Sequence, residues 1–234
     1  MSLKSASKSL KKDMQTQRKF KKKERIFDMQ NTSHAVMAQR HESKDSLDDF
    51  PTPPWATRAL CQQMLWMSPN QKQWDCWEPA CNRGHMSNVL KEYFDRVYST
   101  DIHDYGYGTI FDFLQPTATG ARVAWVITNP PFKHGAEFIE QAHRHARRGV
   151  AMLVRTSFLE GKDRYKRIYL SNPPSTVAQF VERVPMVKGR LDGKASTATS
   201  YCWLIWDKLA PAKHTELVWI EPCRKMLEKE GDYD

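Results

Sequence analysis

Residues 122–128 read R-V-A-W-V-I-T, and N-P-P-F follows directly at residues 129–132. The first stretch is almost continuously apolar, which is typical of a parallel-sheet strand that is buried on both faces. In an open α/β sheet the ligand crevice lies at the carboxyl ends of the strands. The tetrapeptide therefore stands where a functional site is expected, at the end of the central strand.

The residue types at 129–132 suit a flat ligand that carries an amino group. Consecutive prolines keep the backbone extended and remove two N–H donors. The Asn129 side-chain oxygen and the Pro130 carbonyl remain as acceptors for two amino hydrogens, and after Pro131 the Phe132 ring can stack on the ligand. The competing interpretation is an ordinary turn that ends a strand.

Strand and helix patterns alternate on both sides of this central strand. Further strands are predicted at 74–78, 97–101, 110–113, 150–154, 177–181 and 200–206, with an edge strand at 217–220. Helices are predicted at 55–67, 84–94, 135–148 and 160–170, followed by a short charged helix near residue 234. Such alternation predicts an α/β fold with a mostly parallel sheet.

The composition argues against several classes of protein. The chain has 234 residues, 40% of them hydrophobic, which is typical of a globular domain. No apolar run approaches the ~18–20 residues of a membrane helix, and the Lys-rich start lacks the apolar core of a secretory signal. The five cysteines form no C-x-x-C pair, and the histidines lack metal-ligand spacing. We therefore expect reduced thiols, a cytoplasmic protein, and no membrane or metal partner.

The positive charge is concentrated at the N-terminus. Residues 1–25 contain ten Lys or Arg against two acidic residues, which accounts for +8 of the formal net charge of +9. Residues 1–48 are predicted to be a basic, largely disordered arm, and residues 49–234 a folded domain. The arm is either a tether that neutralises nucleic-acid phosphates or a solubilising tail. It could equally be sequence ahead of a true start at Met29 or Met37.

Five motifs occur in a fixed order, and together they carry a family resemblance. They are D-F-P-T-P-P at 49–54, E-P-A-C-N-R-G-H at 78–85, T-D at 100–101, D-F at 112–113 and N-P-P-F at 129–132. In this order the chain resembles the S-adenosyl-L-methionine-dependent DNA methyltransferases that act on the adenine amino group. It is most similar to the small stand-alone enzymes of phages and prophages, which implies the cytoplasm of a bacterial or phage-infected cell.

The resemblance implies a three-layer, Rossmann-like class I methyltransferase fold. Its sheet is expected to have seven mostly parallel strands, the last of them antiparallel. The catalytic residues carried over from the family motif are Asn129, Pro130, Pro131 and Phe132. The cofactor-binding residues carried over are Thr52, Pro53, Glu78, Pro79, Ala80, Gly84, Asp101, Ile102, Asp112, Phe113 and Asn129.

Physical arguments accompany some of these roles. Gly84 allows a close backbone approach to the cofactor, and Asp101 has the position of an acid that takes ribose hydroxyls at the end of a second strand. Asp112 and Phe113 match the pair that holds the cofactor's adenine. Asn82 departs from the usual glycine of the loop, although asparagine tolerates a left-handed backbone better than most residues.

Target recognition is assigned to the loop at residues 185–200. Lys188, Arg190 and Lys194 lie there among glycines and suit contacts with DNA phosphates or base edges; the alternative is an ordinary hairpin loop. Related enzymes often carry a recognition domain after the catalytic domain, whereas only residues 207–234 follow the last main strand here.

Alternative functions are methylation of another planar amine (cytosine-N4, an RNA base or a protein glutamine) and an inactive nucleic-acid-binding relative.

Overall fold

The computed structural model describes residues 48–69, 71–115, 122–211 and 213–233. All of the predicted arm except Asp48 lies outside these ranges. The helices are α3 (Pro54–Ala59), α4 (His85–Tyr93), α5 (Gly135–His145), α6 (Lys162–Arg164) and α7 (Arg224–Leu227), with shorter or π-type turns η2 (Leu60–Met64), η3 (Phe132–His134), η4 (Thr156–Leu159) and η5 (Tyr165–Tyr169). The strands are β1 (Asp75–Glu78), β2 (Arg96–Asp101), β3 (Thr109–Ile110), β4 (Val123–Thr128), β5 (Ala146–Arg155), β6 (Thr176–Phe180), β7 (Tyr201–Asp207) and β8 (Glu216–Ile220).

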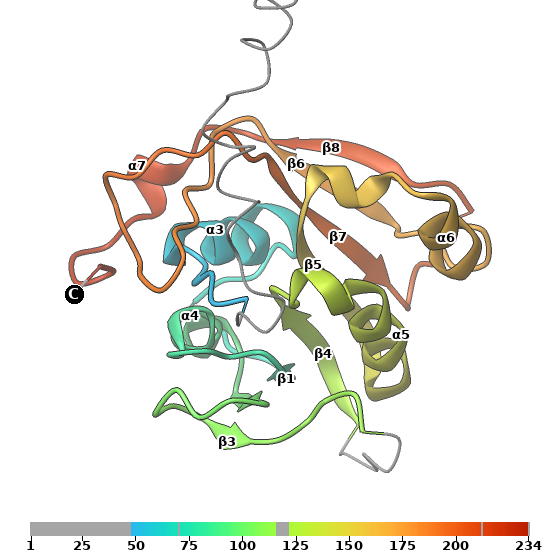
Figure 1. Cartoon of the computed structure of the whole chain (residues 1–234), viewed down its shortest axis with the longest axis horizontal. Helices are drawn as coiled ribbons and strands as arrows, with labels where there is room; N and C mark the ends of the chain where they lie inside the picture. Colours follow the sequence, from blue (N-terminus) through green and yellow to red (C-terminus); the bar gives the residue numbers. More distant parts are fainter. Residues whose placement is uncertain (1–47, 70, 116–121, 212, 234) are drawn as a thin grey trace, which may run out of the picture. The chain divides into compact units, whose positions relative to one another are not determined.

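The strands form one sheet in the order β3-β2-β1-β4-β5-β7-β6-β8. β7 runs antiparallel to both of its neighbours, and the remaining pairs are parallel. The predicted mostly parallel sheet with an antiparallel last main strand is therefore confirmed. β8 adds the expected edge strand, which brings the sheet to eight strands (Figure 1).

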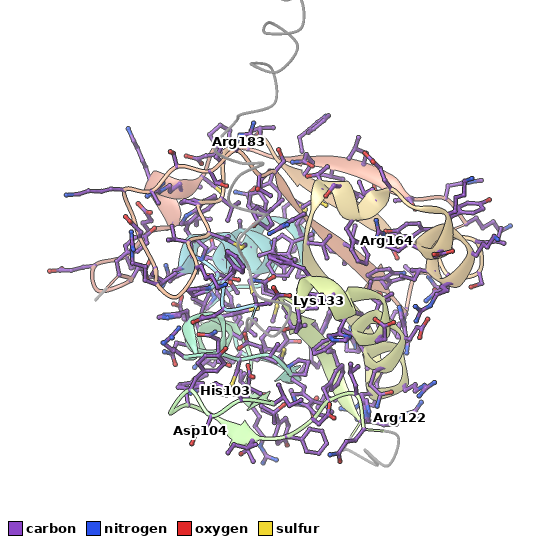
Figure 2. All side chains as sticks on the ribbon, in the orientation of Figure 1. His103, Asp104, Arg122, Lys133, Arg164 and Arg183 are labelled. Atoms are coloured by element: carbon purple, nitrogen blue, oxygen red, sulfur yellow. The ribbon has the colours of Figure 1, made fainter. Side chains whose placement is uncertain are left out.

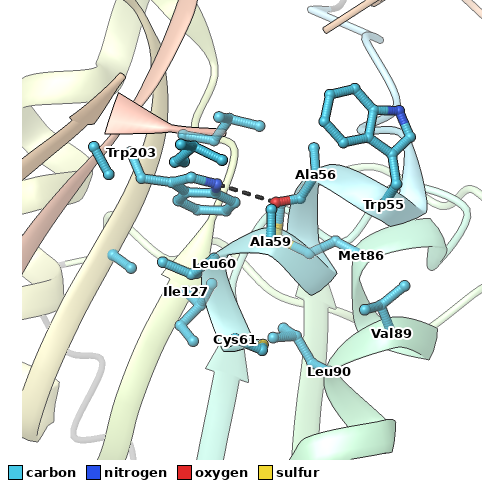
Figure 3. Close-up of a cluster of buried hydrophobic side chains, with 14 of the residues drawn as sticks. Trp55, Ala56, Ala59, Leu60, Cys61, Met86, Val89, Leu90, Ile127 and Trp203 are labelled. Atoms are coloured by element: carbon cyan, nitrogen blue, oxygen red, sulfur yellow. Dashed lines mark hydrogen bonds between the residues drawn. The ribbon is translucent and has the colours of Figure 1, made fainter. Parts of the chain in front are cut away.

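Helices cover both faces of the sheet, with α3 and α4 on one face and α5 and α6 on the other (Figure 1). Alternating side chains of β5 and β7 point to opposite faces: Leu153 and Trp203 join the core under α3 and α4, whereas Met152 and Leu204 join the core under α5. Trp203 also donates a hydrogen bond from its indole nitrogen to the Ala56 carbonyl at 3.2 Å (Figure 3). All six residues of β4 are buried, as expected of a central strand.

Several predicted boundaries differ from the structure. The helix expected at 135–148 ends at His145, because Ala146 already pairs with Val123 in the sheet. The helices expected at 55–67 and 160–170 are each split into a short α-helix and a π-type turn. The third strand is limited to Thr109–Ile110. At the end of α5, tertiary pairing thus overrides the local apolar period.

No helix within the described ranges is long and apolar enough to cross a membrane.

Candidate active site

The amide group of Asn129 has a defined orientation just beyond the end of β4. Its nitrogen Nδ2 donates to the Phe50 carbonyl at 3.0 Å and to the Thr52 hydroxyl at 3.2 Å, and lies 3.8 Å from the Met186 sulfur. A carbonyl can only accept a hydrogen bond, so the amide nitrogen must face Phe50. The oxygen Oδ1 then faces the other way, where it is buried and has no partner among the described residues. A buried acceptor without a donor is available to a ligand or an ordered water.

The ring of Phe132 lies between two side chains. The Phe50 ring is 5.1 Å away between centroids, and the Arg155 guanidinium carbon is 3.7 Å from the Phe132 centroid. The backbone N–H of Phe132 donates to Asp48 at 2.8 Å. These contacts fix the Phe132 ring at the end of the turn that begins with Asn129 and Pro130.

Residues 48–52, which we call the entry strap, connect three loops around this site. Asp49 pairs with Arg83 and accepts a hydrogen bond from the Asn82 amide in the loop after β1. The Asp49 carbonyl accepts the N–H of Gly189, which belongs to the loop between β6 and β7. Together with the contacts to Asn129 and Phe132, the strap thus holds the loops after β1, β4 and β6 in fixed positions.

The loop after β1 keeps its shape although it has Asn82 in place of glycine. Asn82 adopts a left-handed backbone with φ of 49°, as its residue type allows. Its N–H donates to Asp101 at 2.9 Å, and the other Asp101 oxygen accepts the His103 N–H at 3.0 Å. Asp101 therefore orders two loops at the carboxyl end of the sheet and retains lone pairs for a further donor.

Gly84 has a different neighbour from the one that we expected. Its φ is 83°, and a Cβ atom there would lie 2.4 Å from the ring of Tyr107. The space left by the missing side chain is thus filled by Tyr107, whose hydroxyl donates to Asn88 on α4. A glycine is needed here for both reasons, independently of a bound cofactor.

Three other residues predicted to bind the cofactor, Ile102, Asp112 and Phe113, differ in how far they are exposed to solvent. Ile102 directly follows Asp101 and is 64% exposed, so it offers an apolar surface at the end of β2. Asp112 caps its own turn by accepting the Leu114 N–H at 2.9 Å. Phe113 is only 2% exposed and packs edge-on against Trp77. The ring of Phe113 thus belongs to the core under α5, and its stacking on the cofactor's adenine stays a prediction.

Glu78 ends β1 in a fully enclosed position. The Ser87 hydroxyl donates to its carboxylate, and Pro79 and Ala80 follow in the loop. Burial raises the pKa of Glu78 to about 8, and its hydrogen bond with Ser87 only partly opposes this shift. Near neutral pH, the protonated form of this carboxyl is therefore strongly populated in the folded protein.

The raised pKa of Glu78 predicts that stability falls with rising pH. Between pH 4.5 and about 8 the unfolded chain releases this proton before the folded chain does. The contribution of Glu78 to the free energy of unfolding should therefore decrease over this range, by at most about 1.4 kcal/mol per pH unit. It is measured above pH 6.5, because burial lowers the pKa of His143 to about 4 and this group gives the opposite slope below pH 6.5. Urea titrations at several pH values measure the slope. Glu78→Gln should remove it, whereas Glu160→Gln, at an exposed position, should keep it.

The loop at residues 185–200 begins at the site and continues into solvent. Met186 is buried beside Asn129, while Arg190 is exposed and pairs with Asp192 at 3.2 Å. The backbone N–H of Lys194 donates to the same Asp192 at 2.9 Å. Lys188 and Arg190 flank Gly189, the residue that contacts the entry strap, so these cations lie on a loop that is anchored to the site.

Next to Phe132 is a cavity of about 170 Å³. It lies beyond the carboxyl ends of β4 and β5 and is lined by Pro130, Pro131 and Phe132 of the motif together with Gly135, Leu153, Val154, Arg155, Ser157, Phe158 and Arg164. The two arginines lie over aromatic rings, Arg155 over Phe132 and Arg164 over Phe158. Flat apolar and cationic groups thus surround one space.

Solved structures with the same architecture identify the fold. A candidate class I S-adenosylmethionine-dependent methyltransferase from Listeria monocytogenes is 14% identical with a TM-score of 0.56, over 85% of this chain and 76% of that one. The fold is that of a class I methyltransferase. A type I restriction-modification methyltransferase subunit from Streptococcus thermophilus is 12% identical with the same TM-score, over 86% of this chain and 52% of that one.

A candidate RNA methyltransferase from Pyrococcus horikoshii is 15% identical with a TM-score of 0.50, over 71% of this chain and 91% of that one. No protein-family model and no curated protein sequence matches the chain.

All five cysteines are buried and unpaired. Across the described residues, no three His, Cys, Asp or Glu side chains are grouped so that they could hold a metal ion.

Sequence reasoning missed Asp48 and Arg155 as neighbours of Phe132. Asp48 was assigned to the arm, yet its carboxylate accepts the N–H of Phe132 in the turn after β4. Arg155 ends β5, and its position at the carboxyl end of a strand was the one available signal.

Proposed function

We propose that this protein transfers a methyl group from S-adenosylmethionine to the exocyclic amino group of adenine in DNA. The observation that carries the proposal is the buried, unpartnered oxygen of Asn129 beside Pro130 and Phe132. It is supported by the class I methyltransferase fold and by the position of these residues at the end of β4.

The cofactor is proposed to bind at the carboxyl ends of β1 and β2. The exposed Ile102 provides an apolar surface for a flat ring, and Asp101 beside it retains acceptor capacity for hydroxyl groups. Thr52 in the entry strap, which accepts a hydrogen bond from Asn129, and Pro53 directly after the strap would close the side toward the turn after β4. The Glu78 carboxyl at the end of β1 accepts from Ser87 on α4. These donor and acceptor types fit S-adenosylmethionine, which when bound supplies an electrophilic methyl group.

The residues of the tetrapeptide would activate the acceptor amine. Asn129 Oδ1 and the Pro130 carbonyl accept its two hydrogens, which draws the nitrogen lone pair out of conjugation with the ring. Because these acceptors are already oriented, the stabilisation requires little reorganisation. The base must first leave the duplex, at a cost of a few kcal/mol. No covalent intermediate with the protein is needed, so the buried cysteines have no role in this reaction.

Expression in a methylation-free host tests the proposal and its alternatives. Mapping of modified bases in the host DNA should show N6-methyladenine. Modified cytosine in its place, or methylated RNA or glutamine with unmodified DNA, would favour another planar amine. Among known enzymes, an initial Asn in the motif leans toward adenine. Absence of any methylation would favour the inactive relative, against which the intact shape of the Asn82 loop argues.

Asp101→Ala should weaken S-adenosylmethionine binding. The variant loses the proposed ribose contact and the two backbone hydrogen bonds that order the loops. We expect a loss of about 1–3 kcal/mol by titration calorimetry, the range for hydrogen bonds to a charged group. Asp112→Ala should cost less, because its contact to Leu114 is local. Unchanged affinity in both variants would contradict the pocket assignment.

The loop at 185–200 and the basic arm should affect DNA differently. Replacing Lys188, Arg190 and Lys194 by Ala should change which sites are methylated, if the loop reaches base edges. Deleting residues 1–28 should weaken binding to all sequences alike and flatten its salt dependence, because phosphate contacts carry no sequence information. Sequencing of methylated positions at several salt concentrations separates the two effects. An unchanged site pattern in the loop variant would move recognition elsewhere.

A further inference from the structure

Phe132, the ring expected to stack on the acceptor base, is covered on one side by Arg155. The guanidinium carbon is 3.7 Å from the ring centroid, which is ordinary stacking distance. A base that stacks on this face must therefore pass between the two groups. For this, the guanidinium must move away from the ring by about the thickness of one more aromatic ring, ~3.5 Å.

The Arg155 side is the one that can open. Arg155 and Phe132 both line the cavity of about 170 Å³, and Phe50 does not. Phe50 is also fixed by its carbonyl, which holds the amide of Asn129. Displacing Phe50 would therefore disturb the amide of Asn129, whose oxygen is the proposed acceptor. Displacing Arg155 only moves its side chain within the cavity.

Arg155 also has an unused donor at this position. Its Nε is buried and has no partner among the described residues, although Tyr201, its cross-strand neighbour, is linked to the side chain by a hydrogen bond. A buried N–H without an acceptor is open to a ligand atom or an ordered water. Because a guanidinium N–H lies in the plane of the group, a base stacked on its face leaves Nε for a polar atom beside the base, such as a sugar or phosphate oxygen of the same nucleotide.

We propose that Arg155 is a base-binding residue, and that the acceptor base enters between its guanidinium and the Phe132 ring. This inference rests on the proposed function and narrows its substrate. A slot between two flat groups selects a planar heterocycle, which favours a nucleobase over the amide side chain of a protein glutamine. The guanidinium remains on the outer face of the base after it has entered.

Arg164 provides a matched control in the same cavity. It is the last residue of α6 and is labelled in Figure 2. It also lies over a phenylalanine ring, that of Phe158 at 4.7 Å, but its Nε already donates to the Glu160 carbonyl at 2.7 Å. Arg164 therefore shares the charge and the surroundings of Arg155 and lacks both the unused donor and the contact with Phe132.

The test compares Arg155→Ala, Arg155→Lys and Arg164→Ala in the full chain with S-adenosylmethionine and unmethylated phage DNA. Arg155→Ala should raise the KM for DNA about tenfold, the scale of a desolvated cation–π contact. Arg155→Lys should recover little of it, because lysine has the charge without the flat stacking surface. Arg164→Ala should change KM less than about twofold. Melting temperatures verify that each variant is folded.

A KM for Arg155→Ala that is unchanged or lower than that of the parent would overturn the inference, since Arg155 would then only obstruct the ring. Full rescue by Arg155→Lys would overturn it too, because charge alone would be sufficient. A binding measurement distinguishes failure of this inference from failure of the proposed methyl transfer. Single-stranded DNA containing 2-aminopurine should lose fluorescence on binding to the parent chain and less on binding to Arg155→Ala. Equal quenching by the parent chain and by Arg155→Ala overturns the inference, whether or not any DNA is methylated. Absence of quenching by the parent chain also overturns it.

Discussion

Asn129→Ala should lower the turnover of methyl transfer to DNA by at least about 100-fold, the effect of removing one oriented hydrogen-bond partner from a transition state. The substitution removes the acceptor Oδ1, which has no partner among the described residues, and also the donor that links the turn after β4 to Phe50 and Thr52. Single-turnover assays with labelled S-adenosylmethionine measure the chemical step. Cofactor affinity, measured by calorimetry, should change much less.

Asn129→Asp and Asn172→Ala complete this experiment. The aspartate keeps an acceptor toward the ligand but turns a second oxygen toward the Phe50 carbonyl, so its activity should lie between those of the parent and the alanine variant. Asn172 is exposed and its amide contacts His143, remote from the motif in this fold, so its replacement should leave turnover unchanged. A near-parental rate for Asn129→Ala would refute the catalytic assignment.

Arg58→Ala should destabilise the domain by about 3–5 kcal/mol, the usual cost of removing one partner from a buried ion pair. Arg58 is 3% exposed and joins α3 to two distant segments. It pairs with Glu92 at 2.8 Å and with Asp232 at 2.7 Å, and it donates to the Leu227 carbonyl at 2.8 Å. The substitution leaves these acceptors in a partly buried site without their cation. Urea denaturation measures the loss.

Arg147→Ala is the comparison for that result. Arg147 makes the same kind of pair with Asp75 at 3.1 Å, but its side chain is 55% exposed. Exposed pairs contribute about 0–1 kcal/mol, so the denaturation midpoint should shift little. Similar losses in the two variants would show that burial is not the source of the Arg58 effect.

Periodicity and motif order were sufficient to predict the sheet and its helical layers. The apolar run before Asn129 placed β4 at the centre, because a strand buried on both faces leaves that pattern wherever it lies in the chain. Asn82 was likewise expected to tolerate its loop, since the left-handed preference of asparagine is a local property.

Contacts between distant segments were not predictable in the same way. Asp48 has the composition of a polar arm, and only the folded chain brings it to Phe132, 84 residues later. Phe113 matched a ligand-stacking ring by motif, although packing against Trp77 decides its environment. The length of a helix such as α5 depends on strand pairing at Ala146, which the local period does not record.

The entry strap also constrains the order in which the chain can acquire its site during synthesis. Residues 48–52 leave the ribosome well before their partners, since Phe50 and Asn129 are separated by 79 positions and Asp48 and Phe132 by 84. Closing loops of this length carries an entropic cost that only later contacts offset. On a nascent chain that stops before β4, the strap therefore lacks its two partners in the turn after β4, Asn129 and Phe132. A chain released after residue 132 contains all the residues through which the strap contacts the turn after β4, but it lacks β5, the strand that pairs with β4 on the side away from β1.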